Sequence, residues 1–93
     1  MSDISVECSR SGGGWLANVT VTDGRSSRRY QVRVSAAELE RFARGAGEPA
    51  DLVRRSFEFL LARESKESIL ATFDLSVIGR YFPDFEREIT SGR

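Results

Sequence analysis

Apolar and polar residues alternate over the first third of the chain, which is the period of a half-buried β-strand. In the first such stretch, Ile4, Val6 and Cys8 share one side and polar residues share the other. Three stretches carry this pattern, at residues 3–8, 15–22 and 29–34. Glycine-rich or polar turns separate them, so the pattern predicts an antiparallel three-stranded β-meander within residues 3–34.

A helix-start signal follows the third strand. Ser35 and Glu38 fit a capping box, in which each side chain accepts a hydrogen bond from the backbone N–H of the other residue. We therefore expect a helix over residues 36–44, ended by Gly45 and Gly47.

The clearest helical pattern runs over residues 49–64, where apolar side chains recur three and four positions apart. Pro49 suits the first turn, in which no intrahelical N–H is needed. The apolar stripe comprises Leu52, Val53, Phe57, Phe59, Leu60 and Leu61. Because this stripe is wide, we expect Phe57 to face the sheet and Phe59 to face a neighbouring helix or the C-terminal segment.

The C-terminal part, residues 66–89, is predicted to be a helical segment because apolar residues recur at helical spacing through it. Asp74 is placed to cap a helix, and Pro83 should end that helix at or before Phe82. All these elements together predict a single α+β domain of 93 residues. Its expected order is β-β-β-α-α-α, with two or three helices packed on one face of the sheet.

Charge and composition narrow the classes of function. Fourteen basic and fourteen acidic residues cancel, so the chain lacks the excess positive charge typical of nucleic-acid or membrane-surface proteins. There is no histidine and Cys8 is the single cysteine, so we expect no metal, no cofactor and a reducing, cytoplasmic location. The chain shows no secretion signal and no long apolar run, so we expect no membrane association. Without a histidine base we expect no enzyme, unless a pocket gathers carboxylates or Ser and Thr side chains from distant positions.

The segments SFEFLL, ESIL, FDL and RYFP occur in this order within residues 56–89. In this arrangement they resemble a family of small, uncharacterised bacterial proteins. The resemblance covers rather more than a third of the chain and implies a bacterial origin. It implies no activity and no site residues.

Four arginines near the third strand form the best polar candidate site: Arg25, Arg28, Arg29 and Arg33. They could bind nucleic acid or another anion, which is the alternative function. Strand alternation, however, places Tyr30 on the face opposite Arg29 and Arg33, so rings and arginines do not share the surface that an RNA-binding sheet requires. A solvated polar face is the simpler interpretation, and nucleic acid is an unlikely partner.

Large apolar side chains are dense toward the C-terminus, with fourteen between Phe57 and Ile89. The two predicted helices already cover the apolar face of the sheet. This segment therefore either forms internal core under a third helix or contacts another molecule. Tyr81, Phe82 and Phe85 are the candidate interface residues. The leading hypothesis is a small non-enzymatic interaction module that forms a homodimer or binds an unknown protein partner.

Overall fold

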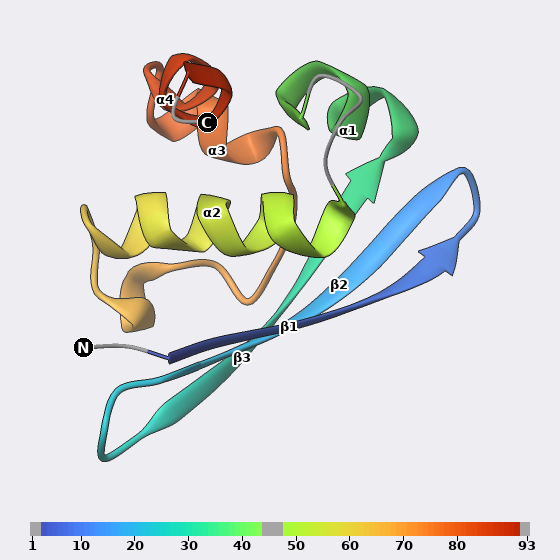
Figure 1. The fold of residues 1–93 in the computed structure, drawn as a ribbon. Coiled ribbons are helices and arrows are strands. Elements are labelled where there is room, and N and C mark those ends of the chain that lie inside the picture. Colours follow the sequence, from blue (N-terminus) through green and yellow to red (C-terminus); the bar gives the residue numbers. More distant parts are fainter. Residues whose placement is uncertain (1–2, 44–47, 92–93) are drawn as a thin grey trace.

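The computed structural model describes residues 3–43 and 48–91, which form one sheet with helices on one side (Figure 1). The elements are β1 (Asp3–Ser11), β2 (Gly14–Thr22), β3 (Ser27–Ser35), α1 (Ala36–Ala43), α2 (Pro49–Leu61), the 3-10 turn η1 (Lys66–Ser68), β4 (Thr72–Asp74), α3 (Val77–Tyr81) and α4 (Phe85–Ser91). Gly45 and Gly47, the expected end of the first helix, lie outside the described residues. None of the helices in the described part of the chain is long and apolar enough to cross a membrane.

The sheet has the strand order β1-β2-β3-β4. β1, β2 and β3 pair antiparallel, as the alternating pattern predicted, and the α+β class is confirmed. The prediction of only three strands was wrong, because β4 pairs parallel with β3 and makes the sheet mixed. The N–H of Gln31 donates to the carbonyl of Ala71 at 2.7 Å, and the carbonyl of Arg33 accepts from the N–H of Leu75 at 2.9 Å. The backbone groups on the far edge of β3 thus find partners in β4 and its flanks.

Two glycines shape the β1–β2 hairpin. Gly12 has φ 59°, in the left-handed region that glycine adopts without steric cost. Gly14 has a different role, because a Cβ atom there would lie 2.2 Å from the backbone oxygen of Val34. Glycine at this position therefore allows β2 and β3 to approach closely where their pairing begins.

The helix α2 lies between the sheet and the other helices, so the domain has three layers (Figure 1). Phe57 faces the sheet, and its ring centroid is 5.1 Å from that of Tyr30 and 6.2 Å from that of Phe73. Phe59 faces the other way, with its ring 5.2 Å from Phe85 of α4. The expected division of the apolar stripe between two partners is therefore confirmed.

The C-terminal part of the chain differs from its sequence pattern. α2 was expected to reach residue 64 but ends at Leu61, where Ala62 caps it and the chain turns. The predicted helical segment 66–89 is instead a 3-10 turn, a strand and two short helices. The physical reason lies at the edge of β3, where backbone N–H and C=O groups need hydrogen-bond partners. Residues 71–75 supply these partners in an extended conformation, which a helix could not do.

Of the two expectations for the helix before Pro83, the one for its start was wrong and the one for its end is confirmed. Asp74 does not cap a helix, because its carboxylate accepts a hydrogen bond from Nε of Arg33 at 2.6 Å on the neighbouring strand. α3 ends at Tyr81, with Phe82 as its C-cap residue, as the following proline predicted.

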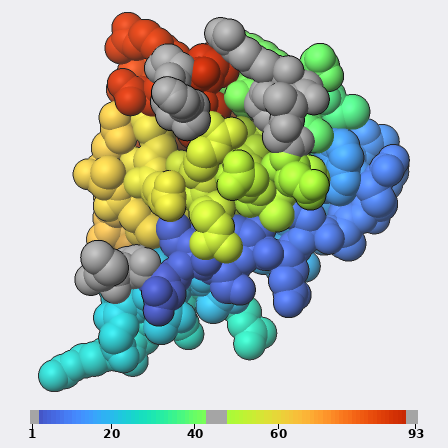
Figure 2. Space-filling model, in the orientation of Figure 1, coloured from blue at the N-terminus to red at the C-terminus, as the bar shows by residue number. Residues whose placement is uncertain are grey.

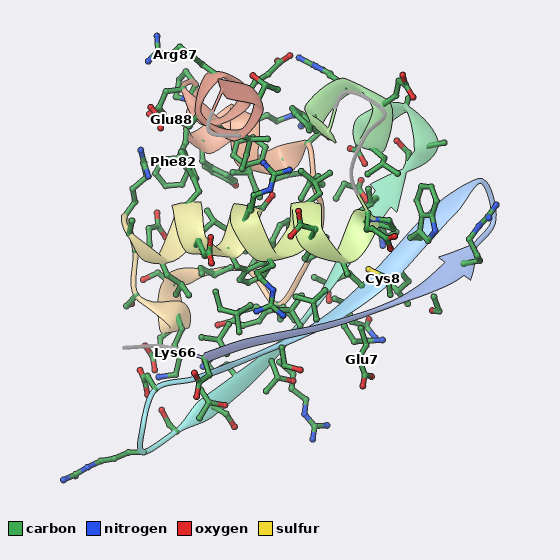
Figure 3. All side chains as sticks on the ribbon, viewed as in Figure 1. Glu7, Cys8, Lys66, Phe82, Arg87 and Glu88 are labelled. Carbon is green, nitrogen blue, oxygen red and sulfur yellow. The ribbon has the colours of Figure 1, made fainter. Side chains whose placement is uncertain are left out.

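The sheet face opposite α2 carries no helix of the described residues (Figure 1). Side chains alternate along β1 accordingly: Figure 3 shows Cys8 pointing toward α2 and Glu7 pointing away from it. Glu7, Asn18, Gln31 and Thr72 form one row across all four strands of this open face. Nε2 of Gln31 donates to Oδ1 of Asn18 at 3.3 Å. The open face is thus a polar surface in contact with solvent.

Candidate functional site

An apolar groove of about 230 Å³ lies beside the C-terminal end of α2. Its walls come from three segments: the end of α2, residues 68–73, and α3 with its C-cap. The lining residues are Leu60, Glu64, Ser68, Ile69, Leu70, Phe73, Val77, Ile78, Tyr81 and Phe82. Apart from the Glu64 carboxylate and the Ser68 and Tyr81 hydroxyls the lining is aliphatic or aromatic, so the groove suits an apolar group.

Two large apolar side chains of this groove are exposed, with 52% of Leu70 and 67% of Tyr81 accessible to solvent. No other large apolar side chain in residues 3–43 and 48–91 is exposed to this degree. Phe82 is half-buried, and its ring meets Phe59 edge-on at 5.8 Å. The exposed apolar surface of the described chain is therefore concentrated at the groove.

The turn that contains Lys66 fixes one end of the groove. The hydroxyl of Tyr30 donates to the backbone carbonyl of Lys66 at 2.6 Å, which ties η1 to β3. Figure 3 shows Lys66 at this turn, beside the end of the sheet. Its ammonium group is 2.8 Å from the carboxylates of Asp23 and Glu67, and the side chain is only 5% exposed. These contacts hold the turn against the β2–β3 connection. The chain that follows the turn therefore runs beside β3 and pairs with it as β4.

Lys66 and its two carboxylates stabilise one another's charged forms. Hydrogen bonds from Lys66 lower the pKa of Asp23 and of Glu67, and the same bonds raise the pKa of Lys66. Burial raises the pKa of the Tyr30 hydroxyl. Every group in this cluster therefore keeps its ordinary charge state at neutral pH, which indicates a structural clamp rather than an acid–base pair.

The third segment of the groove, α3, is tied to α1 by Glu38. The predicted capping box is confirmed: the N–H of Ser35 donates to Oε1 of Glu38 at 2.8 Å, and the N–H of Glu38 donates to Oγ of Ser35 at 3.0 Å. The second oxygen, Oε2 of Glu38, accepts from the N–H of Ser76 at 3.1 Å, directly before α3. One carboxylate therefore caps α1 and fixes the start of α3.

Of the three residues predicted for an interface, Tyr81 and Phe82 line the groove. Phe85 requires a correction, because it is 0% exposed and lies inside the chain. Its ring is 5.3 Å from Phe42 and 5.2 Å from Phe59, because α4 folds back over α1 and α2. For Phe85 the internal-core alternative is the right one.

Sequence reasoning did not single out Leu70 and Glu64 as site residues. The helical segment predicted over residues 66–89 would have put Leu70 on one face with Ile69 and Phe73. The extended chain instead buries Ile69 and Phe73 and turns Leu70 toward solvent. The available signal was the polar interruption SKES at residues 65–68, which separates this stretch from the stripe of α2.

The four candidate arginines do not gather on one surface. Arg25 lies in the β2–β3 turn. Arg28 lies on one face of the sheet, and Arg29 and Arg33 lie on the opposite face. Nε of Arg33 is 2.6 Å from the carboxylate of Asp74. Arg29 lines a hollow of about 550 Å³ on the open sheet face. Each arginine therefore meets different surroundings, and no cluster of positive charge results.

In the part of the chain that the structure describes, no group of three or more His, Cys, Asp or Glu side chains could hold a metal ion. The same residues leave no buried side-chain nitrogen or oxygen without a hydrogen-bond partner. Comparisons with protein-family models, curated proteins and solved structures found no match. The function is therefore inferred from the groove itself.

Proposed function

We propose that this protein is a non-enzymatic interaction module whose groove beside α2 receives an apolar anchor from a partner protein. The observation that carries the proposal is that the exposed apolar side chains, Leu70 and Tyr81, both line this groove. Apolar surface gathered at one place on a small protein commonly marks an interaction site. A partly exposed ring such as that of Tyr81 is also a frequent source of binding energy at interfaces.

The size of the groove favours a side-chain anchor over a metabolite. Its volume of about 230 Å³ is below the roughly 300 to 1,000 Å³ of small-molecule sites. The polar groups of its lining are the Glu64 carboxylate and the Ser68 and Tyr81 hydroxyls. Among the described residues no hydrogen bond joins this carboxylate to either hydroxyl, as a nucleophile with an activating base would require. A single leucine-sized or phenylalanine-sized side chain is the occupant that this groove suits.

Glu64 adds a second feature to the expected partner. Its carboxylate lines the groove, and within the described residues no hydrogen bond or ion pair reaches this side chain. A lysine or arginine next to the apolar anchor would therefore meet an unpaired opposite charge. We infer that the occupant is a short protein segment with one apolar anchor flanked by a basic residue.

Selection of peptides from a random displayed library against the purified protein tests this function. Enriched peptides should share a Leu, Ile or Phe anchor with a Lys or Arg within a few positions. Leu70→Glu should weaken binding of an enriched peptide about tenfold or more, because it puts a charge on the apolar rim. Glu64→Lys should shift the selected flanks from basic to acidic.

Leu16→Glu is the matched control, because it places the same change on the open sheet face, away from the groove. Binding of the enriched peptide should be unchanged in this variant, with circular dichroism showing that both variants stay folded. If Leu16→Glu weakens binding as much as Leu70→Glu, or if enriched peptides share no anchor, the groove is not the binding site.

A further inference from the structure

β1 is a long free edge of the sheet. It spans nine residues, and among the described residues it pairs with β2 alone, in a continuous register without a bulge. In Figure 2 the blue residues of β1 lie at the surface directly beneath the yellow-green helix α2. The other edge strand, β4, has only three residues. The described sheet therefore has one edge that is long enough to pair with a further strand.

The register shows which backbone groups face outward on this edge. Ser11 and Gly14 pair across a two-residue turn and so form a hydrogen-bonded pair, which directs the odd-numbered residues of β1 toward β2. The outward N–H and C=O groups belong to Ile4, Val6, Cys8 and Arg10. The carbonyl of Ile4 confirms this direction, because it accepts a hydrogen bond from the Arg54 side chain of α2.

The side chains along this edge are incompletely covered. Ile4, Val6 and Cys8 pack against the core on the helix side of the sheet but remain half-buried. β1 contains no proline, no lysine and no bulge, three features that commonly block edge pairing, and its charged residues are Asp3, Glu7 and Arg10. An apolar row and outward backbone groups therefore coincide along one edge, where among the described residues Arg54 occupies the carbonyl of Ile4 and no hydrogen bond reaches the outward groups of Val6 and Cys8.

We propose that β1 pairs antiparallel with β1 of a second copy of this chain, about a two-fold axis at Val6. This register sets Val6 opposite Val6 of the second copy and Ile4 opposite Cys8, so the row on the helix side is apolar from Ile4 to Cys8, with Arg10 beyond its end. The outward backbone groups of both copies then face each other, and two four-stranded sheets join into one. This dimer goes beyond the proposed groove function, because it uses a different surface.

Charged side chains favour this register over its neighbours, since a register centred on Ser5 would set Asp3 opposite Glu7 of the second copy. On the open face the register centred on Val6 sets Ser5 opposite Glu7 and Asp3 opposite Ser9 of the second copy, so no like charges stand directly opposite each other. A register centred on Glu7 would set two carboxylates directly opposite each other, which is destabilising. A register centred on Cys8 would set Arg10 against Val6 within the apolar row. The sequence of β1 is thus self-complementary in the register centred on Val6.

Sedimentation velocity of the full chain, from about 10 µM to about 1 mM, tests the proposal. Because the contact is small, we expect a weak dimer that forms with rising concentration. Ser5→Glu should weaken it about fivefold by placing a carboxylate opposite Glu7 of the second copy, at both symmetric positions. Ser5→Lys should tighten it, and Ser5→Glu combined with Glu7→Lys should restore it.

Ser27→Glu is the matched control, since Ser27 is exposed on the same open face but lies on β3, away from the edge. It should leave the dimer unchanged. A chain that stays monomeric at the highest concentration overturns the proposal. Equal weakening of the dimer by Ser5→Glu and Ser27→Glu also overturns it. A third contradicting result is that Ser5→Lys fails to tighten the dimer, because tighter association could not be caused by a folding defect. A dimer lost only in Leu70→Glu also overturns it, because the contact would then lie at the groove.

Discussion

Truncating Phe85 to alanine should cost a large part of the stability of this domain. Phe85 is 0% exposed, and its ring packs 5.3 Å from Phe42 and 5.2 Å from Phe59, so no other group can fill the space it leaves without repacking three helices. Removing a buried phenylalanine costs about 3 to 5 kcal/mol. Two aromatic pairs, worth roughly 0.5 to 1.5 kcal/mol each, place the loss near 4 kcal/mol. A 93-residue domain has only about 5 to 14 kcal/mol in total.

Urea unfolding followed by circular dichroism measures this loss, and thermal unfolding should show Tm lower by about 15 to 30 °C. Tyr81→Ala is the control: because Tyr81 is 67% exposed, its loss should stay within about 0.5 kcal/mol. A cost below about 1 kcal/mol for Phe85→Ala, or a cost that depends on protein concentration, would refute the reasoning. The second result would return Phe85 to the interface that the sequence suggested.

Three further perturbations test the scaffold. Tyr30→Phe removes the buried hydroxyl that donates to the carbonyl of Lys66, so urea unfolding should show a loss of about 1 to 3 kcal/mol. A hydrogen bond from Lys66 lowers the pKa of Asp23 below its ordinary value of 3.8. The ionised carboxylate of Asp23 therefore stabilises the fold fully above pH 3.8, and this stabilisation disappears as the carboxyl group is protonated at lower pH. Urea midpoints between neutral pH and pH about 2 should therefore fall less steeply in Asp23→Asn than in the parent. Gly14→Ala should destabilise strongly and Gly13→Ala only slightly in thermal unfolding, because a Cβ atom meets backbone at the first position and nothing within 4 Å at the second.

The elements that sequence predicted correctly are those specified by residues close together in the chain. The meander follows from alternation within each strand, and the start of α1 follows from Ser35 and Glu38, three positions apart. β4 could not be predicted in this way, because three residues are too short to show a period. Its conformation depends on the hydrogen-bonding groups that Gln31 and Arg33 present at the edge of β3.

The candidate site was predicted only in part for the same reason. The many apolar residues of the C-terminal segment indicated more apolar surface than the sheet face could cover. Two of the predicted interface residues, Tyr81 and Phe82, do line the groove. Which ring is covered depends on how α4 folds back, and this folding buries Phe85. Leu70 became a site residue because its neighbours adopt an extended rather than a helical path.

The parallel pairing of β3 with β4 also bears on the order of folding. β1, β2 and β3 are neighbours along the chain and can assemble by closing short loops, whereas β4 reaches β3 only across the segment that contains α1 and α2. Closing that longer loop costs more entropy, so the fourth strand should dock late and separate early. Residues 68–73 lead into β4 and form part of the groove wall. We therefore expect the groove to belong to the least persistent part of the sheet, so that a local unfolding of the kind that precedes global unfolding would open it.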